Sequence, residues 1–395
     1  MPGESFRFEL RSVVESGPGS RRRVAGWLGG LGARRPLLVT DRGVRAAGAS
    51  AAVEEALSQA GADVRIAGRI EDVPQDARTG AIEGIVAAYR AAGADAIVAV
   101  GGGSVIDAAK VARWALGRGV QVVDQALTGN RGERSPKAGA LGVPLIALPT
   151  TAGTGAEVSP IAVVLNERLG IKVNLLSPYI AADVAILDAE LTLGLPAEVT
   201  AYTGFDALTH AVEAVCSPRA SGLSDAYALA ALRTIARDLP RVVADGQDVA
   251  ARGRMLVASL MAITAFGQAL DAIPVHNLAH AIGGRFGLPH GLCNAVLLPA
   301  LVAALPDFYR GRAGELLDAL GAPVVDGPGG PDALAGHLRQ LRQALGLPGD
   351  FGRHALPTMA PGELCALVAG DPSGVAYTLA AETVERVAQE VWGAG

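Results

Sequence analysis

Histidine is rare in this chain and unevenly placed. The sequence holds six histidines, and the stretch HNLAHAIGGRFGLPH at 276–290 contains His276, His280 and His290. A single histidine in an apolar helix is usually a hydrogen-bonded core residue, so each of them alone admits that interpretation. Three together can also be metal ligands or proton carriers, because imidazole binds metals readily and titrates near neutral pH.

A second segment adds a carboxylate to these histidines. TGFDALTHAVEA at 203–214 places Asp206 and His210 four residues apart, which puts both side chains on one face of a helix. Imidazoles and a carboxylate without a thiolate suit Fe, Zn, Mn, Co or Ni, and ligand type alone does not choose among them. The residues therefore predict a divalent metal site in the second half of the chain.

A glycine-rich turn in the first half of the chain offers a different chemistry. In VAVGGGSVIDAAK at 98–110, Gly101, Gly102 and Gly103 lie between a predicted strand and a predicted helix. Glycine lets a ligand approach the backbone closely, and the free N–H groups at a helix start attract phosphate. A plain tight turn is the alternative. The first strand–helix turn, VTDRGV, lacks the G-x-G-x-x-G pattern, so a nucleotide would sit differently from the standard dinucleotide fold.

Two further polar positions follow predicted strands. LPTTAGTGAEVS at 148–159 offers the hydroxyls of Thr150, Thr151 and Thr154. Ligands of open α/β sheets lie beyond the carboxyl ends of the strands, so this second loop supports nucleotide binding. Asp41, just after the first strand, could accept hydrogen bonds from a ribose 2′-hydroxyl and would repel a 2′-phosphate, which favours NAD over NADP. A role for Asp41 as a helix cap is the alternative.

The elements that must position these residues differ between the two halves. Short apolar runs alternate with helical patterns up to about residue 190, which predicts a mostly parallel sheet with helices on both faces. Beyond it the patterns are helical. We expect an α/β dinucleotide-binding domain at 1–190 and an all-helical metal-binding domain at 191–395. The predicted strands are 34–41, 62–68, 94–104, 121–124, 143–151 and 183–188, and the predicted helices among them are 44–60, 75–92 and 105–116.

Composition bounds the function further. The chain has 395 residues, half of them hydrophobic, and a formal net charge of −5. The basic surface of a nucleic-acid-binding protein is therefore not expected. Three scattered cysteines suggest reduced thiols in a cytoplasmic protein. The N-terminal stretch has no apolar signal-peptide core, and no long uncharged apolar window predicts a membrane span.

Taken together, several segments resemble the iron-containing (group III) alcohol dehydrogenase family. They run in the family's order and cover most of residues 36–300. The resemblance implies a Rossmann-like N-terminal domain and an all-helical C-terminal domain, as in dehydroquinate synthase. The matching segments are GGGSVIDAAK, LPTTAGTGAEVSPIAVV, VAILDAELT, LPAEVTAYTGFDALTHAVEAVCS and HNLAHAIGGRFGLPHGLCNAVLLP.

The resemblance also assigns roles to individual residues. It implies a divalent metal, usually Fe²⁺ and alternatively Zn²⁺ or another ion, held by Asp206, His210, His276 and His290. It places His280 beside the nicotinamide and substrate, as a candidate proton relay. The residues that it assigns to the NAD(H) site are Asp41, Gly101, Gly102, Gly103, Ser104, Asp107, Thr150, Thr151, Thr154 and Lys172. Arg285 and Phe286 depart from the commonest versions of the motif and are candidates for lining the substrate pocket.

The implied activity is that of an NAD(H)-linked alcohol dehydrogenase or aldehyde reductase, acting as a homodimer. Its substrate is a small alcohol or aldehyde, with anionic aldehydes such as phosphonoacetaldehyde or succinic semialdehyde among the candidates. Zinc enzymes like dehydroquinate synthase or glycerol dehydrogenase are the first alternative. A maleylacetate reductase is disfavoured, because such enzymes usually lack the Asp206/His210 pair. The remaining alternative is a non-enzymatic protein with a structural metal.

Overall fold

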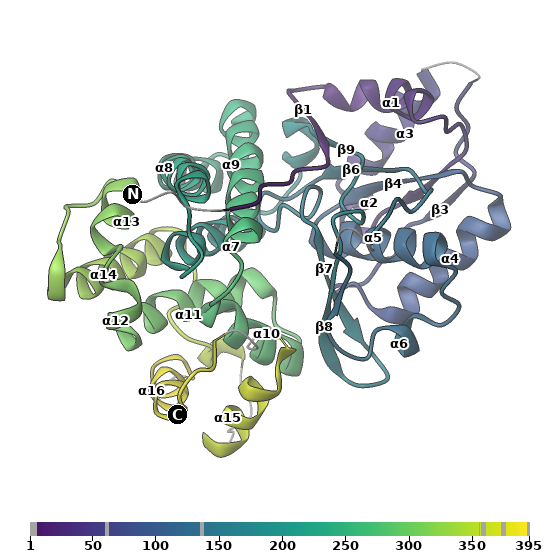
Figure 1. Cartoon of the computed structure of the whole chain (residues 1–395). Helices are drawn as coiled ribbons and strands as arrows, with labels where there is room; N and C mark the ends of the chain where they lie inside the picture. Colours follow the sequence, from purple (N-terminus) through teal and green to yellow (C-terminus); the bar gives the residue numbers. More distant parts are fainter. Residues whose placement is uncertain are drawn as a thin grey trace. The chain divides into compact units, whose positions relative to one another are not determined.

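A computed structural model of the chain describes residues 6–59, 63–134, 138–354, 356, 361–372 and 377–392. The chain divides into two compact units (Figure 1). One unit consists of residues 9–196 with Gly246–Leu260, and the other of residues 6–8, Ala197–Asp245 and 261–392. The predicted boundary near residue 190 stays a prediction, since these units are assembled from interleaved segments.

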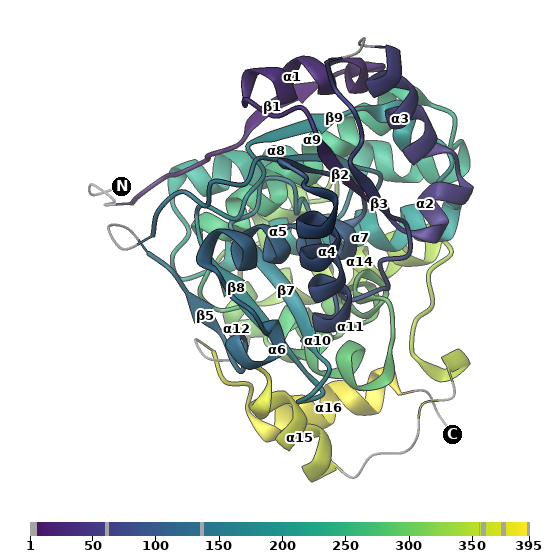
Figure 2. The ribbon, with the colours of Figure 1, turned by 90° about the vertical axis from the view of Figure 1, so that its right-hand side faces the viewer.

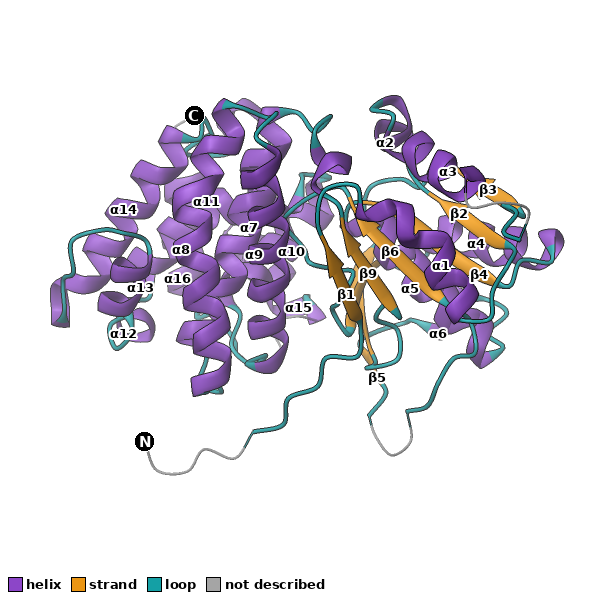
Figure 3. Cartoon of the chain, turned by 90° about the horizontal axis from the view of Figure 1, so that it is seen from above, coloured by secondary structure: helices purple, strands orange, loops and turns teal. Residues whose placement is uncertain are grey.

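The first unit is built on a parallel six-stranded sheet, which Figure 3 shows in orange. Its strand order is β1-β9-β6-β4-β2-β3, and every neighbouring pair is parallel. After β3 the chain returns to the other side of β2 and continues as β4, so the winding reverses between β2 and β4. The strands are β1 (Val13–Ser16), β2 (Pro36–Val39), β3 (Gly68–Ile70), β4 (Ala96–Gly101), β6 (Leu145–Pro149) and β9 (Val184–Leu187).

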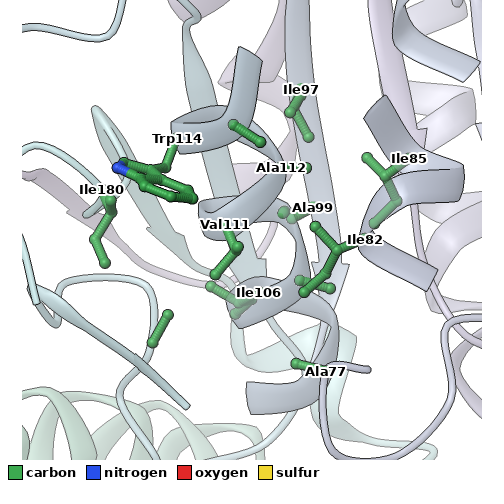
Figure 4. Close-up of a cluster of buried hydrophobic side chains, with 14 of the residues drawn as sticks. Ala77, Ile82, Ile85, Ile97, Ala99, Ile106, Val111, Ala112, Trp114 and Ile180 are labelled. Carbon is green, nitrogen blue, oxygen red and sulfur yellow. The ribbon is translucent and has the colours of Figure 1, made fainter. Parts of the chain in front are cut away.

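Helices cover both faces of this sheet, so its central strands are apolar on both sides. On β4, Ile97 and Ala99 belong to one buried cluster, while Val98 and Val100 belong to another. Successive strand residues point to opposite faces, and a parallel sheet buried on both faces needs an apolar residue at every position. Figure 4 shows the first cluster, in which the Trp114 ring lies toward Ile180, on the opposite side of its helix from Ile97 and Ala99.

The helices of the first unit explain part of this packing. α1 and α3 contribute to the second cluster and α4 and α5 to the first. Figure 2 shows α4 and α5 side by side below β2 and β3. The helices are α1 (Val24–Gly30), α2 (Arg42–Ala46), α3 (Ala49–Gln59), α4 (Thr79–Ala92), α5 (Gly103–Arg118) and α6 (Val123–Ala126), with the 3-10 turns η1 (Ser20–Arg23) and η2 (Ala189–Thr192).

The α/β prediction for this part is confirmed, with corrections in detail. The segment 121–124 is not a strand, because Val123–Ala126 forms the short helix α6. The strand predicted at 62–68 begins only at Gly68, and residues 60–62 lie outside the described part of the chain. The helix predicted at 44–60 is two helices, separated where Gly48 takes a positive φ of 82°.

A second, three-stranded sheet was not predicted. It has the order β5-β8-β7, and β7 and β8 form an antiparallel hairpin whose turn lies at 167–170. Along β7, buried residues alternate with half-buried ones, as expected for a sheet with only one face in the core. The strands are β5 (Arg131–Gly132), β7 (Ile161–Asn166) and β8 (Ile171–Leu176).

All regular elements among the described residues of the second unit are helices, as predicted. Two helices that hold predicted metal ligands, α7 and α11, pack directly on each other. α9 is divided between the two units, because the first unit includes its residues up to Leu260. It is apolar and long enough to cross a membrane by composition alone, yet two-thirds of that apolar window is buried, as in a core helix. The helices are α7 (Ala197–Cys216), α8 (Gly222–Ala244), α9 (Val249–Gln268), α10 (Pro274–Phe286), α11 (His290–Ala304), α12 (Pro306–Tyr309), α13 (Ala313–Ala319), α14 (Gly330–Ala344), α15 (Pro361–Gly370) and α16 (Ala381–Val391), with the 3-10 turns η3 (Gly327–Gly329) and η4 (Gly352–His354).

Candidate functional site

Three of the predicted metal ligands converge in the helical unit. Asp206 on α7, His276 on α10 and His290 at the start of α11 each offer a ligand atom within 4.8 Å of the other two. Asp206 Oδ1 lies 3.8 Å from His276 Nε2 and 3.5 Å from His290 Nε2. Ligands at about 2.1 Å from a tetrahedral ion lie about 3.4 Å apart, so this spacing fits a common divalent ion.

The other two predicted histidines lie beside this group. The His210 ring stacks on the His276 ring, with centroids 4.6 Å apart and planes 21° apart. The His280 ring is 4.9 Å from the His290 ring and 6.0 Å from the His276 ring. His210 is thus not among the three residues whose ligand atoms converge, but its ring lies on that of His276, and the His280 ring lies closer to His290 than to His276.

The charges in this cluster respond to one another. Burial opposes ionisation of Asp206, but His210, His290 and His276 outweigh it and hold the pKa of the carboxyl group below its usual range. Burial also favours neutral His276, yet Glu213 and Asp206 raise its pKa to about 9. The carboxylates around these imidazoles thus favour positive charge in the cluster, and a divalent cation fits such a donor set.

Helix packing brings these side chains together. Every residue of α7 from Gly204 to Cys216 is buried, so this helix lies inside the unit with its polar side chains directed at other helices. A Cβ atom on Gly291 would lie 2.4 Å from the Tyr202 carbonyl oxygen. Only glycine permits this close approach of α11 to α7, and the residue before it is His290.

Two residues of the cluster were missed by sequence reasoning. Glu213 accepts hydrogen bonds from the Val275 backbone N–H (2.6 Å) and from His276 Nδ1. The Asn294 side-chain amide donates to Asp206 Oδ1 (2.7 Å), with its nitrogen 3.2 Å from His290 Nε2. The available signal was helical spacing, since Glu213 lies seven residues after Asp206 and Asn294 four after His290.

In the other unit, the two predicted nucleotide loops follow adjacent strands and touch. A Cβ on Gly102 would meet the Thr151 side chain at 3.2 Å, and one on Gly103 would meet Thr154 at 2.7 Å. Helix α5 begins at Gly103, and Gly102 before it has no side chain to cap the first N–H groups. The turn therefore has the free donors and the close packing that a phosphate-binding turn uses.

Two further predicted cofactor residues, Thr150 and Asp41, differ in their hydrogen bonding. The Thr150 hydroxyl is buried, and it has no hydrogen-bond partner among the residues that the structure describes. Asp41 caps α2, because its Oδ1 accepts from the Val44 N–H at 2.9 Å. Asp41 and the glycine turn follow β2 and β4, the two strands between which the winding reverses, and such switch points are where ligands bind in open α/β sheets.

Asp107 takes part in a buried network below this turn. Its carboxylate accepts from Lys110 Nζ (2.9 Å) and from the Val163 N–H (3.0 Å), and Lys110 also donates to the Ala156 carbonyl (3.0 Å). These bonds tie α5 to the threonine loop and to β7. The structure thus shows Asp107 holding the glycine turn against its neighbours.

Lys172 on β8 also has a partner that the sequence did not reveal. Its ammonium group forms an ion pair with Asp76 at 2.9 Å, and both side chains are largely buried. The Asp76 N–H donates to the Ser104 hydroxyl at 3.0 Å, and Asp76 has a positive φ of 72°, which is uncommon for a residue other than glycine. Asp76 therefore links two predicted cofactor residues, Lys172 and Ser104.

Arg285 and Phe286 end helix α10. Arg285 is exposed, and its guanidinium carbon lies 5.7 Å from the centroid of the Phe286 ring. Phe286 in turn packs edge-on against Trp392, with centroids 6.0 Å apart. These residues form an aromatic group with a cation at its edge.

Comparisons with known proteins agree with this architecture. The model of the iron-containing alcohol dehydrogenase family matches residues 12–189, and that of its C-terminal domain matches residues 200–357. The NAD-dependent methanol dehydrogenase of Bacillus methanolicus is 36% identical over 299 residues, covering 76% of this chain and 75% of the relative. The 4-hydroxybutyrate dehydrogenase of Cupriavidus necator is 39% identical over 278 residues, covering 69% and 70%.

The fold comparison extends over nearly the whole chain. A crystal structure of 1,3-propanediol oxidoreductase matches with a TM-score of 0.87 at 29% identity, covering 98% of this chain and all of the other. The two family models together span most of the sequence, including the glycine turn and the histidine cluster. The chain belongs to the iron-containing alcohol dehydrogenase family.

Proposed function

We propose that this protein interconverts a small alcohol and its aldehyde with NAD(H), at an iron site in its helical unit. The enzyme is an oxidoreductase acting on CH–OH groups, with NAD(H) and iron as its cofactors. The convergence of Asp206 Oδ1, His276 Nε2 and His290 Nε2 is the observation that carries the proposal. The proposed ligands are Asp206, His210, His276 and His290.

The protein groups have separate tasks in this reaction. When bound, the metal supplies Lewis acidity toward the substrate oxygen, and the nicotinamide gives or accepts the hydride. Asp206 and the ligand histidines hold the cation in a buried site. His280 lies beside His290 and carries the proton between the substrate oxygen and solvent, since imidazole exchanges protons near neutral pH.

The cofactor is proposed to bind in the N-terminal half, at 1–190, where the two touching loops supply N–H groups and hydroxyls. Asp41 after β2 accepts from the ribose 2′-hydroxyl with the carboxylate oxygen that Val44 leaves available, and this favours NAD over NADP. Asp107 supports the turn through Lys110. The residues proposed to contact NAD(H) are Asp41, Gly101, Gly102, Gly103, Ser104, Thr150, Thr151, Thr154 and Lys172.

The substrate test starts from iron-loaded protein prepared without oxygen. NADH and NADPH consumption are followed across a panel of short aldehydes, including ones with phosphonate and carboxylate groups. We expect steady consumption of NADH in preference to NADPH. A reaction that proceeds without net change in the nicotinamide would instead indicate a lyase like dehydroquinate synthase and would contradict the proposal.

Anionic aldehydes are the proposed substrate class within this panel. The exposed Arg285 is the cation that supports this choice. We expect Arg285→Gln to raise KM for an anionic aldehyde more than for a neutral aldehyde of the same length. Equal effects on both would leave small neutral aldehydes as the substrates.

A homodimer in the cytoplasm is proposed for the protein as a whole. β1 is an edge strand of the six-stranded sheet, and its residues Val13 and Val14 are 47% and 38% exposed. An edge strand with apolar side chains can pair with another copy. Sedimentation should give a dimer, and Val14→Glu should shift it toward the monomer. The three cysteines, none of which is in a disulfide, support the compartment, which cell fractionation tests.

A further inference from the structure

Glu213 is a carboxylate buried in the helical unit, and both of its oxygens are used. It lies on α7, the helix that carries Asp206 and His210, and its exposed fraction is 1%. Oε1 accepts the Val275 N–H at 2.6 Å, and Oε2 is in hydrogen-bond contact with His276 Nδ1. Two bonds to different atoms of α10 leave this carboxylate little freedom to rotate.

The contact with His276 determines where that imidazole carries its proton. An ionised carboxylate can only accept hydrogen bonds, so Nδ1 of His276 must be the donor. Nε2 is then the nitrogen that faces Asp206 Oδ1, at 3.8 Å. A histidine that binds a metal through Nε2 needs this arrangement, with its proton on Nδ1 and its lone pair on Nε2.

The contact with Val275 fixes the position of the whole helix. α10 begins at Pro274, and Ile273 before it makes no side-chain cap. Glu213 satisfies an N–H of this first turn and places a negative charge where a helix start favours one. The same carboxylate therefore orients both the His276 ring and the helix that carries it.

We propose that Glu213 is a positioning residue of the metal centre. It holds His276 with Nδ1 protonated and Nε2 directed at the ion, and its charge strengthens the donor power of the imidazole. The inference rests on the proposed ligand set of Asp206, His210, His276 and His290. Metal-binding histidines commonly donate their second N–H to a carboxylate, and loss of such a partner weakens metal binding about 10–100-fold.

Glu213→Gln separates this role from simple helix capping. The glutamine side chain has one oxygen and one NH₂ group, whereas the two neighbouring groups are both donors. If its oxygen caps Val275, its NH₂ donates to His276 Nδ1 and moves the imidazole proton to Nε2, where it blocks the metal. If its oxygen faces His276 instead, Val275 loses its acceptor. Shape is kept in either case, and charge is lost.

The experiment measures Fe²⁺ and Co²⁺ dissociation constants by competition with a chelator, on purified full-length protein. We expect Glu213→Gln to weaken binding about 10–100-fold and to shift the visible absorption bands of the Co²⁺ form. Asp238→Asn is the matched control, because Asp238 is another fully buried carboxylate of this unit and is paired with Arg237. It should keep the wild-type affinity and spectrum.

Three outcomes are distinguished. Unchanged affinity and an unchanged Co²⁺ spectrum in Glu213→Gln would overturn the role of Glu213. If His276→Ala also kept its metal, the proposed ligand set itself would be wrong. Should Glu213→Gln not fold, Glu213→Asp keeps the charge but withdraws it by one methylene, and we expect a smaller loss of affinity. Wild-type affinity in Glu213→Asp with an unchanged spectrum would then overturn the inference.

Discussion

Asp206 and His276 are polar side chains that the helical unit buries away from water. Burial disfavours the ionised carboxylate, and the surrounding imidazoles hold its pKa down. An isolated charge in such surroundings is costly, so the cluster needs all of its members. Each side chain of the cluster has a different task, and substitutions should separate these tasks.

The residue that best separates chemistry from metal binding is His280. We expect His280→Asn to keep its iron, since three other side chains supply the converging atoms, but to lower kcat about 10²–10⁴-fold through loss of proton transfer. His354→Asn, in the 3-10 turn η4, should leave kcat unchanged. Iron content and kcat are measured on the same samples. Full activity in His280→Asn would show that His280 does not carry the proton.

Helices and strands position these residues, and the sequence reveals only some of the contacts by which they do so. The strand at 94–104 was predictable, because a continuous apolar run ending in glycines is typical of a buried parallel strand. The β7–β8 hairpin was missed, because its turn, ERLG, lacks the Asn-Gly or Asp-Gly pairs that signal a tight hairpin. The Asp206/His210 spacing was readable within one helix. The contact of Glu213 with His276, 63 residues along the chain, depends on helix packing and was not.

Close packing of α11 against α7 gives a test at the level of elements. Gly291→Ala would place a Cβ 2.4 Å from a backbone carbonyl, so α11 must shift and carry His290 with it. We expect iron affinity to fall at least tenfold. Gly336→Ala is the control, because a Cβ there meets no atom within 4 Å. Chelator competition on both variants checks this, and equal affinities would show that His290 tolerates the shift.

The threonine loop contains a buried carboxyl group that should make stability depend on pH. Burial raises the pKa of Glu157 from 4.5 to about 7, against the opposing effects of its own N–H and Lys110. Between these pH values the folded protein holds a proton that the unfolded chain has released. Stability is therefore lost as pH rises from about 4.5 to about 7, by roughly 3 kcal/mol.

Glu157→Gln should remove this dependence. Compared with the wild type, we expect the variant to gain urea resistance at pH 8 and to differ little at pH 5. Glu55→Gln, at an exposed position, is the control and should shift neither midpoint. If the wild type and the variant had the same urea midpoint at pH 5 and at pH 8, this would show that Glu157 stays ionised in the folded protein.

For the whole molecule, the sequence predicted the fold class and the family better than the boundaries of its parts. The order of strands and helices is local information, whereas the compact units interleave distant segments of the chain.

Iron should stabilise the protein, because only the folded chain brings the ligand atoms together. At 100 times the dissociation constant, binding contributes about 2.7 kcal/mol, or a melting-temperature rise of about 3 °C if the chain unfolds as one unit. Calorimetry with and without Fe²⁺ measures it, and His276→Ala should show no shift.

Hydride transfer to NAD⁺ should depend on iron bound by the Asp206 and histidine cluster. The most direct measurement is NADH formation from a short alcohol, made together with iron content, on protein that is stripped with a chelator and then reloaded stepwise without oxygen. We expect activity to disappear with the iron and to return in proportion to it, up to one iron per chain. Stripped protein that still formed NADH at the full rate would contradict this dependence on iron.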